Sequence, residues 1–137
     1  MGIINKNGIS RAFFKILELS EYFLDFLHQE KPLSFLNLAE APGGFIQGLQ
    51  YIRDTLVHNR ASKWSIFDYY VGNSINLKMK GNYPEWSPFI LKNPRVNIVN
   101  GDICDDSTLE NIQKYCSKSF QKKFHMITAD CGIDVSK

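Results

Sequence analysis

Two adjacent glycines at the end of an apolar run form the first place in this sequence that could bind a ligand. Residues 35–53 read FLNLAEAPGGFIQGLQYIR, in which Gly43 and Gly44 separate the apolar run from an amphipathic stretch. Glycine has no Cβ atom, so backbone N–H groups beside it can approach a ligand, and it accepts positive φ angles. A helix that begins here would add unpaired N–H groups and the positive end of its dipole. The combination suits a carboxylate or a phosphate.

The two glycines have four possible interpretations, of which three are ligand sites of different classes and one is a turn that binds no ligand. A dinucleotide site would require G-x-G-x-x-G, and a P-loop would require Gly-Lys followed by Ser or Thr. The segment APGGFIQG provides neither. The third class binds the methionine part of S-adenosylmethionine. A tight strand–helix turn with no ligand remains open, because two adjacent glycines are a weak signal by themselves.

Two aspartates extend the pattern to other apolar runs. Asp102 follows the run 95–100 in VNGDICDD, and Asp130 ends the run 124–130 in FHMITAD. The carboxyl ends of parallel strands share one edge of a sheet, where ligands bind. In the usual strand order the first and fourth strands are neighbours, so Asp130 is expected to face the glycine turn across a cleft. A single aspartate there is often only a loop cap, but three polar strand ends at one edge favour a site.

Apolar spacing predicts the elements that must position these residues. Residues 10–30 have a helical apolar stripe, with Ser10 as the expected N-cap, and end before Pro32. Short apolar or β-branched runs predict strands. The expected strands are 33–39, 63–77 (or two pieces broken near Gly72), 95–100 and 124–130, and residues 78–94 are expected to form a loop. The expected helices are 10–30, the segment after Gly44 and 106–120. The last of these helices is expected to be capped by Asp106 or Ser107 and to place Leu109, Ile112, Cys116 and Phe120 on one face.

The alternation of strands and helices predicts the fold class. It indicates an α/β, Rossmann-like parallel sheet with helices on both faces. Such sheets normally have five or more strands, and this sequence provides four. Residues 1–137 are therefore expected to be the N-terminal portion of a single larger domain, with its first four strands present.

Composition narrows the class of protein. Of the 137 residues, 44% are hydrophobic and 22% charged, as in soluble globular proteins. No apolar run is long enough to span a membrane, and the N-terminus lacks a secretory signal. Cys104, Cys116 and Cys131 are odd in number and far apart, which argues against a disulfide framework or a metal site and favours a reducing, intracellular compartment. A net charge of +2 neither demands nor excludes a nucleic-acid partner.

Four segments together resemble one enzyme family. SRAFFKILEL (10–19), FLNLAEAPGGF (35–45), VNGDICDD (99–106) and MITADCG (126–132) are similar, in this order, to the opening motifs of FtsJ-like ribose 2′-O-methyltransferases. The resemblance covers nearly the whole chain. It implies a Rossmann-like fold, S-adenosylmethionine as cofactor and RNA as substrate.

The resemblance also implies roles for single residues. Lys15, in S-R-A-x-x-K, and Asp130 match the first lysine and the aspartate of the family's catalytic Lys-Asp-Lys-Glu tetrad. The second lysine and the glutamate belong to later strands and are expected beyond Lys137. No metal is implied. The cofactor-binding residues that the resemblance implies are Ala41, Pro42, Gly43, Gly44, Phe45, Asp102 and Ile103.

The segment after the second expected strand bears on the substrate. VGNSINLKMKG (71–81) is similar to the matching segment of eukaryotic and large-virus cap methyltransferases, which implies capped mRNA as the substrate and the cytoplasm, including a viral factory, or the nucleus as the location. A ribosomal RNA methyltransferase and an inactive RNA-binding or scaffold module remain alternatives. Whether Asp68 or residues 73–77 contact the cofactor ribose stays open, as does the oligomeric state.

Overall fold

The computed structural model describes residues 8–56, 61–75, 85–119 and 122–130. Predictions for residues 76–84, Phe120 and Cys131 lie outside these ranges. The strands are β1 (Ser34–Leu38), β2 (Tyr69–Ser74), β3 (Val96–Asn100) and β4 (Met126–Ala129). The α-helices are α2 (Arg11–Leu19), α3 (Leu24–Leu27), α4 (Gly44–Tyr51), α5 (Ala61–Trp64), α6 (Pro88–Leu91) and α7 (Asp106–Lys118). The 3-10 turns η1 (Ser20–Tyr22) and η3 (Ser65–Phe67) follow α2 and α5, and the π-helical segment η2 (Ile52–Leu56) follows α4.

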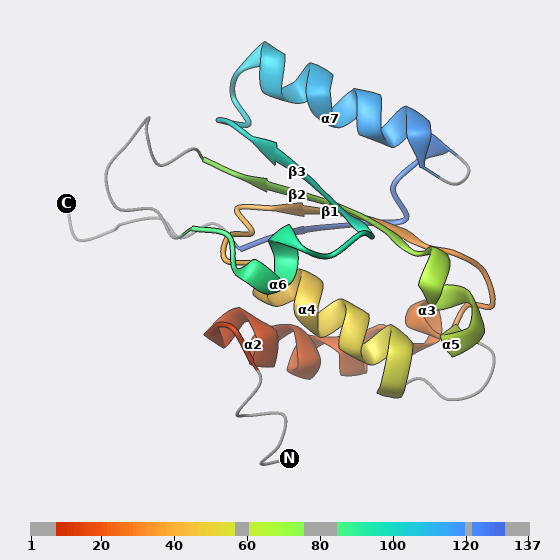
Figure 1. Cartoon of the computed structure of the whole chain (residues 1–137). Helices are drawn as coiled ribbons and strands as arrows, with labels where there is room; N and C mark the ends of the chain where they lie inside the picture. The colour runs from red at the N-terminus through yellow and green to blue at the C-terminus, as the bar shows by residue number, and fades with distance from the viewer. Residues whose placement is uncertain (1–7, 57–60, 76–84, 120–121, 131–137) are drawn as a thin grey trace.

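The strands form one parallel sheet in the order β3-β2-β1-β4 (Figure 1). Leu36 of β1 lies opposite Val71 of β2 and Ile127 of β4. β1 is buried on both faces along most of its length, which is typical of a central strand in a parallel sheet that helices cover on both sides. The predicted neighbour relation of the first and fourth strands is confirmed.

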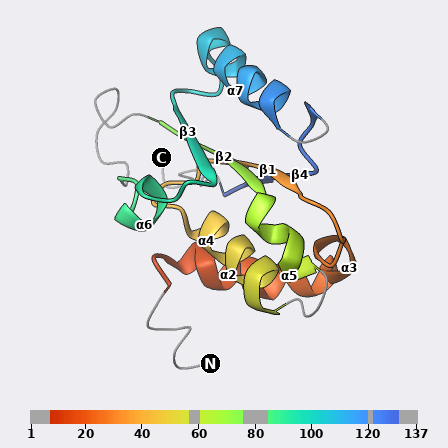
Figure 2. The same ribbon diagram turned by 45° about the vertical axis from the view of Figure 1, so that its right-hand side comes forward.

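Helices cover both faces of the sheet, as Figures 1 and 2 show: α7 lies over one face, and α2 and α4 lie over the other. Successive strand residues point to opposite faces. Phe35 therefore joins the core beneath α2 and α4, and Leu36 joins the core beneath α7. Each fully buried Leu, Ile or Phe contributes roughly 1.5–3 kcal/mol. The predicted α/β class is confirmed.

The prediction of one continuous helix over residues 10–30 is wrong, because this range contains α2, η1 and α3. The chain leaves helical geometry at Phe23, where φ is −140°, after the 3-10 turn η1. The Ser20 hydroxyl donates to the Leu17 carbonyl oxygen, a local bond that competes with a regular helix. The break redirects the chain so that Leu27 is fully buried. Ser10 does occupy the N-cap position, but its side chain makes no capping bond.

The second strand begins later than predicted. Residues 63–67 form the end of α5 and the turn η3, and β2 starts at Tyr69 and runs through Gly72 without a break. The apolar composition of 63–67 suggested a strand, yet Ile66 and Phe67 are 64% and 62% exposed. The Asp68 N–H donates to the Ser65 carbonyl oxygen and closes the turn. The stretch predicted as loop contains the short helix α6, capped by Ser87.

The last helix also differs in detail. Its N-cap is Asp105, one residue before the predicted cap. Thr108 and Ile112 are its buried residues, whereas Leu109 is 45% exposed. Among the described residues of the predicted apolar face, Ile112 is buried and Leu109 and Cys116 are not, because the sheet beneath α7 contacts a face rotated toward Thr108.

Candidate active site

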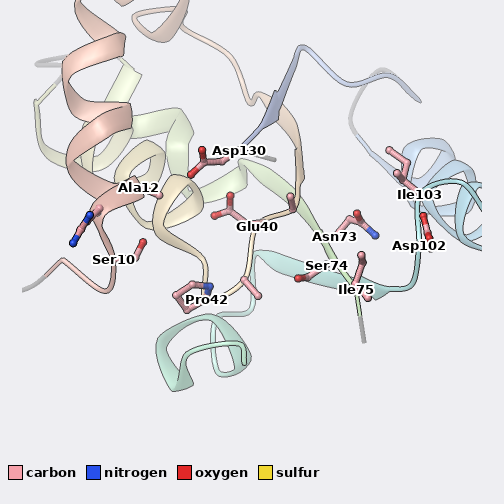
Figure 3. Close-up of a pocket in the computed structure, with 13 residues that line it drawn as sticks. Ser10, Ala12, Glu40, Pro42, Asn73, Ser74, Ile75, Asp102, Ile103 and Asp130 are labelled. Atoms are coloured by element: carbon pink, nitrogen blue, oxygen red, sulfur yellow. The ribbon is translucent and has the colours of Figure 1, made fainter. Parts of the chain in front are cut away.

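A pocket of about 490 Å³ opens where the strands reach their carboxyl ends (Figure 3). Small-molecule sites typically occupy roughly 300–1,000 Å³. Ser10 and Ala12 of the α2 region lie at one end, and Asp102 and Ile103 lie at the other. The residues that line it are Ser10, Arg11, Ala12, Ala39, Glu40, Ala41, Pro42, Asn73, Ser74, Ile75, Asp102, Ile103 and Asp130.

Lys15 and Asp130 are brought together by α2 and the end of β4. Lys15 Nζ donates to Asp130 Oδ1 at 2.8 Å, across 115 positions of the chain. The side chains are 53% and 34% exposed, so a substrate can reach the pair, and exposed pairs of this kind contribute no more than about 1 kcal/mol to stability. Asp130 lines the pocket, and Lys15 stands beside it. The structure joins the two residues, and their catalytic role stays a prediction.

Glu40 links the end of β1 to the start of α4. The N-cap of α4 is Gly43, which has no side-chain acceptor, and the Glu40 carboxylate accepts the Ile46 N–H at 2.8 Å in its place. The Glu40 N–H donates to the Asn73 carbonyl oxygen at 2.8 Å. Loss of a helix cap typically costs about 0.5–2 kcal/mol. Glu40 therefore holds α4 and β2 at the edge of the pocket.

The Glu40 carboxyl is poised between two charge states. Glu40 is only 4% exposed, and this burial raises the pKa of its carboxyl group to about 8. The N–H groups of Ile46 and Phe45, which bind the carboxylate, oppose the increase. The charge of Asp130 adds to the increase. Near neutral pH, protonated and ionised Glu40 are therefore both populated. A carboxyl group with such a pKa in a pocket is typical of functional sites.

The two glycines serve close packing of the turn. Gly43 has φ of +118°, and a Cβ atom there would lie 2.2 Å from Cγ1 of Ile90. A Cβ atom on Gly44 would lie 2.2 Å from the Ser10 hydroxyl oxygen. Gly43 thus permits the left-handed turn, and Gly44 permits α2 to approach α4.

The predicted cofactor-binding loop divides into two parts. Ala41 and Pro42 line the pocket. Gly43 and Gly44 are not among its lining residues, and Phe45 is 4% exposed within the core beneath α2 and α4. Contact of these three with a cofactor stays a prediction.

Asp102 and Ile103 line the pocket beyond β3, where the sequence predicted them. Asn73 fixes this region, because its Nδ2 donates to the carbonyl oxygens of Val99 and Gly101 at 3.0 and 3.1 Å. The buried amide thereby ties the end of β2 to the loop that carries Asp102.

Asp68 lies at the other end of β2, away from the pocket. Its carboxylate accepts bonds from Arg53 Nε and from the Leu33 N–H, both at 2.8 Å. Residues 73–75 line the pocket instead. Of the two candidates for contact with the ribose, the geometry favours the segment that begins at Asn73.

Sequence reasoning did not single out Glu40, and it included Asn73 only as part of the segment 73–77. The available signals were a carboxyl residue directly before the A-P-G-G turn and an amide within a buried strand. Among the described residues, no group of three His, Cys, Asp or Glu side chains is placed to hold a metal ion. None of the helices in those ranges is long and apolar enough to cross a membrane.

Comparison with known proteins agrees with this geometry. The sequence model of FtsJ-like methyltransferases matches residues 9–137. The chain is also similar to a Drosophila melanogaster protein named Cap-specific mRNA (nucleoside-2'-O-)-methyltransferase 2, with 26% identity over 110 residues. The aligned part is 72% of this chain and 15% of that relative, so the chain spans only a small part of the relative's length. Because the family match covers almost all of the sequence, including Lys15, the pocket residues and Asp130, the chain belongs to the FtsJ-like methyltransferase family.

Proposed function

We propose that this chain forms the cofactor-binding part of an S-adenosylmethionine-dependent RNA ribose 2′-O-methyltransferase. The observation that carries the proposal is the 2.8 Å bond between Lys15 and Asp130 at the edge of the pocket. These residues match the first lysine and the aspartate of the family's tetrad. Their separation in the sequence and their contact in space are what a shared catalytic role requires.

The pocket suits S-adenosylmethionine, which supplies a methyl group on a positively charged sulfur when it is bound. Glu40 and Asp130 offer carboxyl groups to positive charge, and Asp102 and Ile103 would hold the adenosine part. The Ser10 hydroxyl oxygen is buried and has no hydrogen-bond partner within the described residues. Since unpaired buried polar atoms are costly, this hydroxyl is suited to a polar group of the ligand.

Lys15 and Asp130 would orient the ribose hydroxyl. Asp130 accepts one of the three N–H bonds of the Lys15 ammonium group, which leaves the group able to donate to a ribose oxygen. Holding the oxygen in line with the methyl donor provides much of the rate increase in such transfers. The second lysine of the tetrad, expected beyond Lys137, would accept the hydroxyl proton as general base.

Capped mRNA is the substrate that we propose. The segment 71–81 is similar to that of cap enzymes, and the fly relative is named for cap-specific methylation. Ribosomal RNA is the competing substrate of the same reaction. Either substrate places the protein in a reducing intracellular compartment, the cytoplasm or the nucleus.

A transfer assay tests the proposal. The natural full-length polypeptide that contains these residues is incubated with labelled S-adenosylmethionine and with capped RNA, uncapped RNA or ribosomal RNA fragments. We expect label on capped RNA, and none on capped RNA whose target ribose is already methylated. Labelling of ribosomal RNA alone would contradict the cap substrate. Absence of transfer to every RNA, with a complete tetrad present, would contradict the enzymatic function.

A further inference from the structure

The residues that line the pocket include more acidic than basic side chains. Its lining contains three carboxyl groups and one guanidinium, those of Glu40, Asp102, Asp130 and Arg11. Lys15 neutralises Asp130 directly. In the part of the chain that the structure describes, no Lys, Arg or His forms an ion pair with Glu40. Glu40 is thus the buried carboxyl of the pocket without a cation of its own.

Glu40 and Asp130 both line the pocket, as Figure 3 shows, and they are close enough for the charge of Asp130 to act on Glu40. Asp130 disfavours ionisation of Glu40 by charge repulsion, and burial disfavours it further. The N–H of Ile46 stabilises the ionised form. A positive ligand charge between these carboxyl groups would add the missing compensation, because an opposite charge within a few ångströms favours ionisation.

We infer, on the basis of the proposed function, that Glu40 selects the cationic cofactor over its neutral-sulfur product by ionising when the cation binds. The step is balanced: protonated Glu40 and the sulfonium ligand give a Glu40 carboxylate beside the ligand and one proton released to solvent. S-adenosylhomocysteine differs from S-adenosylmethionine by one methyl group and one positive charge. It therefore leaves Glu40 protonated.

This selectivity has a consequence for turnover. Methyl transfer removes the positive charge from the sulfur, so the ionised Glu40 is left beside Asp130 without compensation. Glu40 then takes a proton back from solvent, and the product loses the interaction that held the cofactor. Glu40 would promote exchange of product for cofactor near neutral pH.

Glu40→Gln tests the charge while preserving the helix cap, since the Gln amide oxygen can accept the Ile46 N–H. Binding of S-adenosylmethionine and of S-adenosylhomocysteine is measured by calorimetry at pH 7 in phosphate and in Tris, whose ionisation enthalpies differ. The natural full-length polypeptide is used. Glu110→Gln, an exposed position on α7, is the matched control and is expected to behave as the wild type.

For the wild type we expect proton release with S-adenosylmethionine beyond that seen with S-adenosylhomocysteine. In Glu40→Gln this excess should vanish, and the preference for the cationic ligand should fall about tenfold for each unit by which the bound cation brings the pKa of the wild-type carboxyl below the pH of the measurement. Comparison with the variant also removes any proton exchanged by the ligand's own amino group.

Equal proton release with both ligands, or an unchanged excess in Glu40→Gln, would overturn the inference alone. Failure of both ligands to bind would overturn the proposed function with it.

Discussion

Lys15 shows two properties that are rarely combined in a surface residue. It lies on the polar side of α2 and is 53% exposed, as expected for a solvated lysine on an amphipathic helix. Its ammonium group nevertheless contacts Asp130, which ends a strand more than a hundred residues later. An exposed pair contributes little to folding, so stability gives no reason for this arrangement. The proposed positioning of the substrate would account for it.

Lys15→Met should separate function from stability. We expect methyl transfer by the full-length polypeptide to fall by at least about 100-fold, because the ribose oxygen loses its orienting donor. The free energy of unfolding should change by less than about 1 kcal/mol. Transfer rates and urea denaturation measure the two effects. Lys114→Met, at an exposed position on α7, is the control, and equal rates in the two variants would remove Lys15 from the catalytic set.

The residues of the site were predictable to different degrees. Asp102 and Asp130 were found because each lies within two residues of the end of an apolar strand, and strand ends of a parallel sheet meet at one edge. Glu40 was not found, because its altered pKa comes from burial and from Asp130, both of which exist only in the folded chain. For the glycines, the positive φ that the sequence argument allowed is present at Gly43, and the structure adds that Ile90 and Ser10 occupy the space that side chains at Gly43 and Gly44 would need.

Between elements, the main polar connection is a fully buried arginine. Arg53, in η2, donates to Asp68 through Nε and Nη2, and to the carbonyl oxygens of Leu27, Gln29 and Lys31. These bonds use all five of its N–H donors. They join η2 to the start of β2 and to the chain between α3 and β1, and both side chains of the ion pair are 0% exposed.

Asp68→Ala should destabilise the fold strongly. It leaves the Arg53 guanidinium buried without its counter-ion, which typically costs about 3–5 kcal/mol. Asp54→Ala is the matched control, because Asp54 pairs with Arg95 at a half-exposed position, 35% and 23% exposed respectively. That change should cost roughly 1 kcal/mol. Chemical denaturation measures both, and similar losses would show that the burial of Arg53 is not what makes the pair important.

His125 gives the contact between β1 and β4 a pH dependence. Its Nδ1 accepts the Ser34 N–H at 2.9 Å. Burial lowers the pKa of His125 from its ordinary 6.5, and the charges of Lys31, Lys123 and Arg53 act in the same direction. Because the unfolded chain then binds the proton more readily, the stabilisation is fully present above pH 6.5 and is lost as the pH falls below it.

His125→Gln should remove this part of the pH dependence. The Gln amide oxygen can accept the Ser34 N–H but does not titrate. We expect the wild type to lose more stability than the variant between pH 7.5 and pH 5.5, measured by urea denaturation at each pH. His28→Gln alters an exposed histidine and should follow the wild type. Identical pH profiles for wild type and His125→Gln would contradict the role of the ring nitrogen.

The elements themselves were predicted where local pattern and tertiary packing agree. β1, β3, β4 and α7 lie within the predicted ranges, since each coincides with an apolar run or a helical apolar stripe of the sequence. The helix break at Phe23 and the late start of β2 were not predicted. Arg53 contacts both regions, since it binds the Leu27 carbonyl oxygen after the break and Asp68 before the strand. Nothing in either segment alone indicates a partner that lies elsewhere in the chain.

Across the whole molecule, the amino ends of the strands carry stabilising polar contacts, and the carboxyl ends carry the candidate site. The amino ends of the strands are held by the buried ion pair of Arg53 with Asp68 and by the partly buried contact of Ser34 with His125. The carboxyl ends carry the pocket and the exposed pair of Lys15 and Asp130. This division lets the site retain half-exposed charges and a carboxyl of altered pKa, because the fold does not depend on them for most of its stability.

The last prediction concerns the 137-residue chain taken by itself. We expect it to transfer no methyl group at a measurable rate and to bind S-adenosylmethionine weakly at best, because residues 1–137 provide Lys15 and Asp130 but no match to the second lysine or the glutamate of the tetrad. Loss of a general base typically lowers a rate about 10²–10⁴-fold.

β4 also leaves Ile127 61% exposed, and within the described residues it pairs only with β1, so self-association is expected. Transfer assays and sedimentation of the 137-residue chain beside the natural full-length polypeptide measure both properties. A monomeric 137-residue protein with the transfer rate of the longer polypeptide would show that the catalytic base lies within these residues.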